Sequence, residues 1–323
     1  MTLRPGRDCP LDYRLPSAAF SGETQLSCQS LYVVGGLYGN LQALDALEQL
    51  LLQEPGAQAV FNGDAHWFDR DQQLFLEIEE RLIQHLSLRG NVETELGRIG
   101  DNGAGCGCAY PDSVAEHTVD WSNDIHRTLR TTLMGLPGLR EHMANRPAYA
   151  LVNVNGHRIA ITHGDEQSLA GWQCSREALQ NASRRRQLAT WMTERRVSVL
   201  ATSHTCTPAA LKMAEGVVIN NGAAGMPNFA GTHYGLVSRI ANSQHPLAIY
   251  RTQINDLFVE AIPLVYDQTS FLLDFSRQWP PESPASYSYW NRLIEGPSGT
   301  PHSALLHGFH LCQSNPLQDA CLP

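Results

Sequence analysis

Short apolar runs that end in glycine alternate with helical segments in the first third of the chain. Residues 31–36 (LYVVGG) precede a segment with leucines at helical spacing, for which Asn40 is a suitable N-cap. Residues 59–64 (AVFNGD) and 87–91 (SLRGN) form two further strands, and residues 71–86 between them are helical. This succession of strand, glycine turn and helix predicts an α/β fold.

The rest of the chain predicts more strands around a glycine-rich loop. Residues 100–111 (GDNGAGCGCAYP) form that loop, and a helix capped by Asp112 is expected to follow it through residues 115–135. Asn155-Gly156 is a strong turn signal and predicts a β-hairpin. The other expected elements are strands at residues 149–154, 157–162, 197–204, 216–225, 233–241, 246–252 and 257–264, and a helix at residues 175–195.

The composition describes a folded protein without a basic excess. The chain has 323 residues, of which 42% are hydrophobic and 17% charged, so it can bury a sizeable core and is not disordered. The net charge of −9 argues against a binder of nucleic acid or membrane surfaces. No run approaches the ~20 apolar residues of a membrane span, and the first residues lack the apolar stretch of a signal peptide. We therefore expect a cytoplasmic protein whose eight cysteines are mostly reduced.

Polar side chains that can bind a metal follow four of the predicted strands. Asp64 and Asn91 come at two strand ends in the first part of the chain, and His163 and His204 at two later ones. Loops at the carboxyl ends of parallel strands converge on one sheet edge, so separated positions can meet there. One carboxylate, one amide and two imidazoles suit a borderline divalent metal such as Mn, Fe or Zn. The sequence therefore predicts a metal site at these positions.

Six short segments resemble, in order, the motifs of the calcineurin-like metallophosphoesterase family. They are LYVVGGLYGN, FNGDAHWFD, LRGNVE, ITHGD, ATSHTCTP and INNGAAGMP. The family reads D-x-H-G-N, G-D-x-x-D, G-N-H-[DE], H-G, G-H-T-H and N-x-G-S-x-G. Six motifs in the same order are hard to obtain by chance. The resemblance implies an α/β fold of the four-layer αββα type, in which two mixed sheets are flanked by helices.

This resemblance also divides the chain into three parts. The match spans roughly residues 31–265, which form the metallophosphoesterase-like domain. Residues 1–30 precede it as an irregular lead-in without periodicity. Residues 266–323 follow it as a helical and loop extension packed on the domain, and the last ~25 of them are expected to be a loosely docked tail.

One half of the family's metal site is intact in this sequence. In the family, two metals are bridged by the aspartate of G-D, which is Asp64 here. The second metal also takes the asparagine of G-N-H, the histidine of H-G and the first histidine of G-H-T-H. The resemblance therefore implies that Asn91, His163 and His204 bind one ion together with Asp64.

The other half departs from the family pattern. Gly36 and Tyr38 replace the aspartate and histidine of the first motif, Cys206 replaces the second histidine of G-H-T-H, and Val92 replaces the proton-donating histidine. A thiolate at Cys206 could bind a borderline metal, whereas Gly36 has no side chain to offer. The chain either binds one ion or has rebuilt the first site. The substitutes available for a rebuilt site are His66, Asp69, Tyr38 and Cys206.

Three residues near these motifs are candidate catalytic groups. His66 and Tyr38 are the nearest substitutes for the missing proton donor, although His66 could equally be a hydrogen-bonded loop histidine. Arg89 could clamp an anionic substrate or form an ordinary surface salt bridge. Asp69 is favoured as the N-cap of the acidic helix that follows it.

Two further features have both structural and functional interpretations. Cys106 and Cys108 in the glycine-rich loop could bind metal, form a strained disulfide or simply pack, and the loop could act as a lid. Asp165 follows the motif histidine directly and could orient an imidazole.

The leading hypothesis is a metal-dependent phosphoesterase-like hydrolase that uses an atypical one-metal site and acts on a small phosphorylated molecule. A bound ion would lower the pKa of a water molecule and polarise a phosphoryl oxygen. Because Val92 stands where the family has its acid, weak activity on ordinary monoesters is expected. The alternative is a catalytically silent member of the same fold that binds a metal or a phosphorylated ligand.

Overall fold

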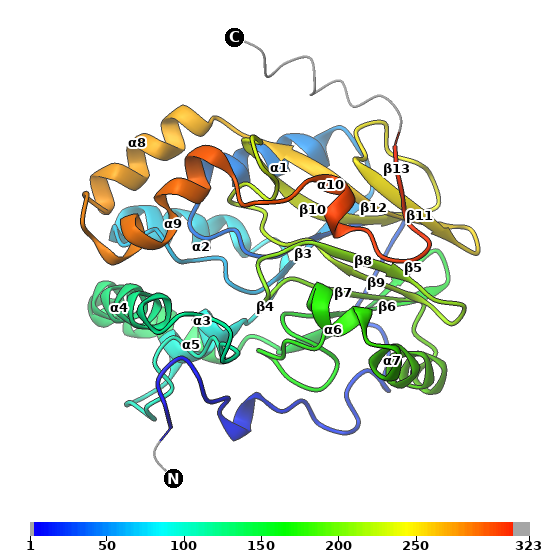
Figure 1. The fold of residues 1–323 in the computed structure, drawn as a ribbon, viewed down its shortest axis with the longest axis horizontal. Coiled ribbons are helices and arrows are strands. Elements are labelled where there is room, and N and C mark those ends of the chain that lie inside the picture. The colour runs from blue at the N-terminus through cyan, green and yellow to red at the C-terminus, as the bar shows by residue number, and fades with distance from the viewer. Residues whose placement is uncertain (1–2, 313–323) are drawn as a thin grey trace.

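Two β-sheets packed face to face form the centre of the molecule, and helices cover their outer faces (Figure 1). A computed structural model describes residues 3–312. Helices α1, α2 and α8 lie over the larger sheet, and α6 and α7 lie over the smaller one. The αββα sandwich that the sequence predicted is therefore confirmed.

The larger sheet has seven strands in the order β13-β11-β12-β10-β2-β3-β4. The strands β2, β3 and β4 run parallel to one another, and β10 pairs antiparallel with β2. The carboxyl ends of the three parallel strands therefore lie at one edge. The strands are β2 (Ser30–Val34), β3 (Ala57–Asn62), β4 (Leu86–Leu88), β10 (Tyr234–Ala241), β11 (Tyr250–Ile254), β12 (Leu257–Val265) and β13 (His310–Leu311).

The smaller sheet has six strands in the order β1-β5-β6-β7-β9-β8. Strands β6, β7 and β9 are parallel, so their carboxyl ends also share one edge. The β5–β6 hairpin turns at Asn155 and Gly156, both at positive φ, as the sequence predicted. The strands are β1 (Leu26–Cys28), β5 (Tyr149–Val154), β6 (His157–Thr162), β7 (Val199–Thr202), β8 (Ala209–Lys212) and β9 (Val217–Asn220).

The core has separate layers because successive strand residues face opposite sides of a sheet. In β2, Leu31 and Val33 pack between the two sheets, whereas Tyr32 and Val34 pack under the helices. All five residues of this strand are buried. A strand covered on both faces needs a continuous apolar run, which is the pattern that the sequence shows there.

The helices that the sequence predicted begin and end close to the expected positions, with three differences. The first concerns α4, whose N-cap is Ala115, not Asp112. The second concerns α2, which is capped by Asp71, whereas Asp69 is used elsewhere. The third is that residues 175–195 form two helices. The helices are α1 (Leu41–Leu52), α2 (Gln72–Leu82), α3 (Asn91–Gly97), α4 (Glu116–Thr132), α5 (Pro137–Ala144), α6 (Arg176–Gln180), α7 (Ala182–Arg195), α8 (Gln268–Gln278), α9 (Pro284–Glu295) and α10 (Pro301–Ala304).

Both ends of the described chain are built into the fold. The lead-in contributes a 3-10 helix at Leu11–Tyr13 and strand β1, which pairs in parallel with β5. In the C-terminal extension, α8 and α9 join the helical layer, and β13 adds to the edge of the larger sheet. The predicted loose tail falls partly on residues 313–323, which lie outside the described residues. Among residues 3–312, no helix combines the length and apolar character that crossing a membrane requires.

Candidate metal centre and active site

Three buried side chains with metal-binding atoms meet where the two sheets present their carboxyl ends. Asp64 follows β3, His163 follows β6 and His204 follows β7. One ligand atom from each lies within 4.8 Å of the others. The predicted convergence of these separated positions is therefore present in the structure.

Asn91 completes a set of four atoms, in which His163 Nε2 lies close to the three others. That nitrogen lies 3.2 Å from Asp64 Oδ2, 3.0 Å from His204 Nδ1 and 3.1 Å from Asn91 Oδ1. The sequence assigned these four residues to one ion. Their inner atoms converge at a distance that a metal with ~2.0–2.2 Å bonds could span with small adjustments.

Backbone carbonyls on the outer side orient each of the neutral ligands. His163 Nδ1 lies 2.9 Å from the carbonyl oxygen of Asn62, and His204 Nε2 lies 2.9 Å from that of Cys108. The Asn91 side-chain amide donates to the carbonyl oxygen of Cys106 at 2.9 Å. A carbonyl only accepts hydrogen bonds, so the outer nitrogens carry protons, and in the neutral form of each imidazole the inner nitrogen presents a lone pair.

Burial would lower the pKa of His163, but the Asp64 carboxylate raises it, so without a cation His163 Nε2 can carry a proton and donate it to Asp64. A divalent cation at this point would take the place of that proton. Burial and the neighbouring His163 lower the pKa of His204 to about 3, which keeps its imidazole neutral. Burial alone would raise the pKa of Asp64, but the His163 charge and hydrogen bond lower it, so this side chain is a carboxylate. One carboxylate, one amide oxygen and a neutral imidazole are the ligand forms that a divalent metal needs.

The Asp64 backbone is held in an unusual conformation by a carboxylate that the sequence analysis did not single out. Asp64 has φ of 55°, which is the left-handed region. Glu93 accepts hydrogen bonds from the backbone N–H groups of Asp64 at 2.9 Å, Ala65 at 2.8 Å and Gly90 at 2.7 Å. The same side chain therefore ties the β3 turn to the β4 turn. In the sequence, Glu93 was visible only as the acidic residue of LRGNVE.

Tyr38 and Cys206 occupy the side where the family has its first metal. A Cβ atom added to Gly36 would lie 2.7 Å from the Tyr38 ring, so the ring covers the place of the family's aspartate. The Tyr38 hydroxyl lies 2.8 Å from Cys206 Sγ. Burial raises the pKa of the Cys206 thiol, which favours the protonated form. The buried metal-capable group of Asp64, His163 and His204 does not include Cys206.

His66 belongs to a buried ion-pair network that faces away from the metal-capable atoms. Its Nδ1 lies 2.5 Å from Asp69, its Nε2 lies 2.8 Å from Glu79, and its ring stacks on Phe75. Arg146 in turn donates to both Glu79 oxygens. Burial would lower the pKa of His66, but Asp69 and Glu79 raise it to about 9. Both nitrogens are occupied, so the structure does not bring His66 to the site as a proton donor.

The other predicted site residues have structural partners. The Arg89 guanidinium donates to the carbonyl oxygens of Ala144 and Arg146, both at 3.1 Å, and the side chain does not line the cavity at the site. Asp165 accepts from backbone N–H groups of its own loop and does not contact an imidazole. Cys106 and Cys108 are free thiols, and their carbonyls contact the ligands.

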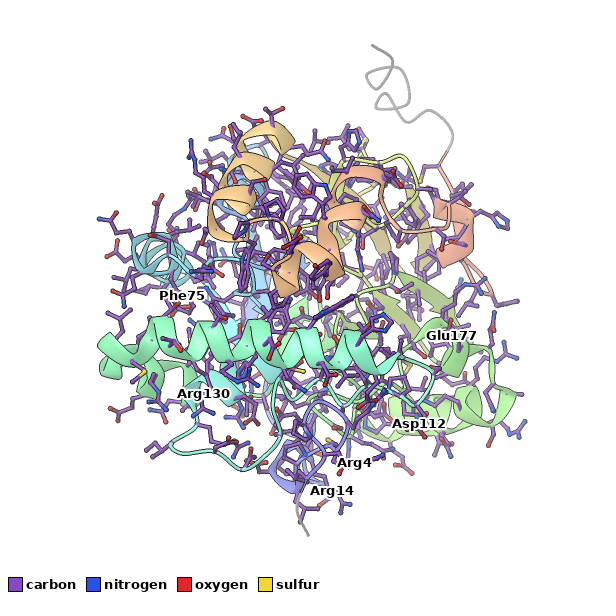
Figure 2. The ribbon with its side chains drawn as sticks, turned by 60° about the vertical axis from the view of Figure 1, so that its left-hand side comes forward. Arg4, Arg14, Phe75, Asp112, Arg130 and Glu177 are labelled. Atoms are coloured by element: carbon purple, nitrogen blue, oxygen red, sulfur yellow. The ribbon has the colours of Figure 1, made fainter. Side chains whose placement is uncertain are left out.

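A cavity of ≈ 230 Å³ opens directly onto the metal-capable atoms. Asp64, Asn91 and His204 line one side of it, and Arg292 lines another. The roof combines the first part of α4 with α9, two helices that Figure 2 shows one above the other at the front of the molecule. Five aromatic side chains also line the wall, and they belong to Tyr38, Trp67, Tyr110, Trp172 and Tyr289.

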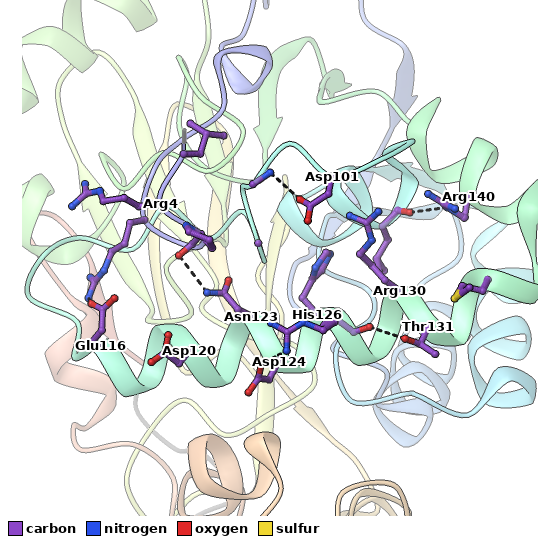
Figure 3. A pocket seen from close by; sticks show the side chains of 18 residues that line it. Arg4, Asp101, Glu116, Asp120, Asn123, Asp124, His126, Arg130, Thr131 and Arg140 are labelled. Carbon is purple, nitrogen blue, oxygen red and sulfur yellow. Dashed lines mark hydrogen bonds and ion pairs between the residues drawn. The ribbon is translucent and has the colours of Figure 1, made fainter. Parts of the chain in front are cut away.

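A larger cavity of ≈ 1250 Å³ lies between the lead-in, the glycine-rich loop and α4 (Figure 3). None of the metal-capable residues lines it. Its Arg130 donates to the Gly100 carbonyl and its Arg140 to the Leu96 and Arg98 carbonyls. Arg130 thus ties the loop to α4, and Arg140 ties α5 to the end of α3. Because the metal-capable residues line the smaller cavity and not this one, the smaller cavity is the candidate active site.

Comparisons with known proteins identify the fold. No family model matches the chain, and no curated protein sequence matches it significantly. The structure is similar to that of a hypothetical protein from Pyrococcus horikoshii, with a TM-score of 0.58 and 17% identity, covering 84% of this chain and 99% of that one. It is also similar to a metallophosphoesterase from Sphaerobacter thermophilus, with a TM-score of 0.50 and 15% identity, covering 83% of this chain and 100% of that one. The chain thus has the metallophosphoesterase fold with a divergent sequence.

Replacing His204 should remove bound metal. Loss of a residue that only orients a ligand costs roughly 10–100-fold in metal affinity. Because His204→Ala removes a direct ligand, we expect it to lower the metal affinity by more than that. Elemental analysis after equilibration with Mn²⁺ or Zn²⁺ would measure this effect. The exposed His302→Ala variant is the matched control and should bind metal like the wild type. Equal metal content in both variants would show that the ligand assignment is wrong.

Removing Glu79 should destabilise the fold. The Glu79→Ala variant leaves the buried Arg146 and His66 without their shared carboxylate, and breaking such a buried pair costs about 3–5 kcal/mol. Urea unfolding would measure the loss in free energy of unfolding. The control is Glu80→Ala, which removes an exposed carboxylate from the same helix and should change stability by less than about 0.5 kcal/mol.

Glu79 should also contribute to acid destabilisation. Burial would raise its pKa, but hydrogen bonds and charges from His66 and Arg146 lower the pKa to about 2, from an ordinary value of 4.5. The carboxylate therefore stabilises the fold fully above its ordinary pKa, and this stabilisation is lost as pH falls toward the folded value. The difference in unfolding free energy between wild type and Glu79→Gln should shrink between about pH 4.5 and 2. A difference that stays constant with pH would contradict this assignment.

Proposed function

We propose that this chain is a metal-dependent phosphoric ester hydrolase that uses one divalent ion and acts on a small phosphorylated molecule. The observation that carries the proposal is the convergence of four lone-pair atoms on one point at the carboxyl edge of both sheets. The fold supports it, because a metallophosphoesterase has the same architecture. The adjoining cavity supplies space for a compact substrate.

Side chains fill the side of the site where the family has its first metal, and this supports a single ion. Tyr38 covers Gly36, and its hydroxyl contacts the Cys206 thiol. The Tyr38 and Cys206 side chains pair with each other, and Cys206 is not part of the buried group of Asp64, His163 and His204. A second ion would therefore need the Tyr38 ring to move out of a buried position. The two-metal alternative left open by the sequence is disfavoured on this ground.

A divalent ion at this site would lower the pKa of a bound water and polarise a phosphoryl oxygen. The residues that would hold it are Asp64, Asn91, His163 and His204. The carbonyls of Asn62 and Cys108 fix the two imidazole orientations, so the ligand set is preorganised. The mixed oxygen and nitrogen ligands suit Mn, Fe or Zn.

Protonation of the leaving group has no strong donor in the cavity. Val92 occupies the family's acid position, and His66 is bound elsewhere. Tyr38 lines the cavity, and burial raises the pKa of its hydroxyl well above the usual value, so the group keeps its proton. It can orient a leaving oxygen but is a weak acid. Substrates whose leaving group needs no proton are therefore favoured.

An assay of metal and turnover on one preparation tests the proposal. We expect about one ion per chain, slow hydrolysis of p-nitrophenyl phosphate, and at least roughly 100-fold slower hydrolysis of an alkyl phosphate, which needs a general acid. Asp64→Asn should abolish turnover. Metal without turnover would favour the silent metal- or phosphate-binding alternative, and absence of metal after reconstitution would contradict both. The cytoplasmic location and the absence of nucleic-acid and membrane partners stay predictions.

The metal count should not depend on Cys206. We expect Cys206→Ser to bind the same single ion as the wild type, because the thiol contacts Tyr38 and not the ligand atoms. Metal titration followed by elemental analysis would measure the stoichiometry. A fall from two ions to one in this variant would show instead that the first site has been rebuilt.

A further inference from the structure

The cavity beside the metal-capable atoms contains hydrogen-bond donors that have no partner among residues 3–312. Trp67 is 3% exposed, and its indole N–H faces the Tyr289 hydroxyl without reaching hydrogen-bond geometry. The Ser288 hydroxyl is also buried without a partner among the described residues. Both side chains line the cavity. Buried donors of this kind normally have an acceptor, so the cavity is built to receive one.

Arg292 adds a positive charge to the same wall. Its Nε donates to the carbonyl oxygen of Pro227 at 3.2 Å, and one Nη donates to that of Cys206 at 2.8 Å. These carbonyls fix the guanidinium but do not neutralise it, and no carboxylate in the described part of the chain forms an ion pair with it. Its other Nη has no hydrogen bond to a described residue. A rigid, uncompensated guanidinium favours an anion with several acceptor oxygens.

Helix geometry places two of these donors on one face. Ser288 and Arg292 are four residues apart on α9, so their side chains lie one above the other along the helix. Helix α9 belongs to the C-terminal extension, outside the region that carries the six motifs. The extension therefore supplies part of the wall of the cavity that Asp64 and His204 also line.

We propose that Arg292, Ser288 and Trp67 form an anion-binding subsite that holds the phosphoryl oxygens of a compact phosphate monoester. This inference rests on the proposed function, since it assigns the substrate class for the same site. The cavity of ≈ 230 Å³ is smaller than the roughly 300–1,000 Å³ of pockets for drug-sized ligands. The donors and the positive charge take the phosphoryl group, and the aromatic wall packs against one small substituent. The second substituent of a diester would have to share this compact cavity, so the monoester is favoured.

Phosphate binding by Arg292 variants tests the subsite separately from catalysis. The probe is inorganic phosphate, titrated into the Mn²⁺-loaded full chain by calorimetry. Losing a hydrogen bond to a charged group costs about 1.5–3 kcal/mol, so Arg292→Met should bind phosphate roughly 10–100-fold more weakly, with unchanged metal content. Arg292→Lys keeps the charge and should recover part of the affinity. The control is Arg277→Met on α8, which removes an exposed arginine far from the cavity lining.

A second variant covers the case in which Arg292→Met does not fold. Ser288→Ala removes one neutral donor and should weaken phosphate binding roughly threefold to tenfold. In turnover assays, both variants should raise KM for p-nitrophenyl phosphate more than they lower kcat. The wild type should prefer this monoester over bis(p-nitrophenyl) phosphate by at least roughly tenfold in kcat/KM.

The outcomes separate the subsite from the proposed function. Phosphate affinity in Arg292→Met and Ser288→Ala within twofold of the Arg277→Met control overturns the subsite, even if metal and turnover are present. A preference for the diester overturns the substrate class. Absence of metal in the wild type overturns the proposed function, and phosphate titrated into the metal-free chain then decides the subsite by the same comparison of variants.

Discussion

The convergence of four buried polar side chains on one point is the constraint on which the candidate site depends. Asp64, Asn91, His163 and His204 come from four separate turns, and each has its inner atom directed at the same point. In this arrangement His163 Nε2 lies within 3.2 Å of the three other inner atoms. Backbone carbonyls hold the outer side of both imidazoles and of the Asn91 amide. Positioning by rigid backbone makes the cluster a preorganised candidate site for a cation.

The N-terminal lead-in supports the loop that supplies two of these carbonyls. The carbonyls of Cys106 and Cys108 belong to the glycine-rich loop, which has no regular secondary structure of its own. The lead-in holds that loop through hydrogen bonds from Gly6 N–H to the Ala104 carbonyl and from Tyr110 N–H to the Gly6 carbonyl. A segment without periodicity thus supports the ligand geometry from outside the domain's motifs.

The side of the site that carries the altered motif residues is filled by side chains. Tyr38, at positive φ, turns its ring over Gly36, and Cys206, also at positive φ, meets its hydroxyl. The adjoining cavity is lined by aromatic rings and by Arg292 from α9, which makes it compact and gives it one positive charge.

The sequence alone determined the layered fold and the convergence of the candidate ligands, because both depend on local patterns. Apolar runs ending in Gly-Asp, Gly-Asn or His specify strands that place donors at one sheet edge, whatever the packing around them. The partners of individual polar side chains depend on tertiary contacts instead. His66 lies two residues after Asp64 but turns into the helical layer toward Glu79, and Arg89 turns toward the end of α5. Arg292 lies in α9, outside the region of the motifs, and the packing of α9 against α4 brings it to the cavity. Side-chain direction and long-range packing leave no periodic trace in a sequence, so only the tertiary structure decided which charges reach the site.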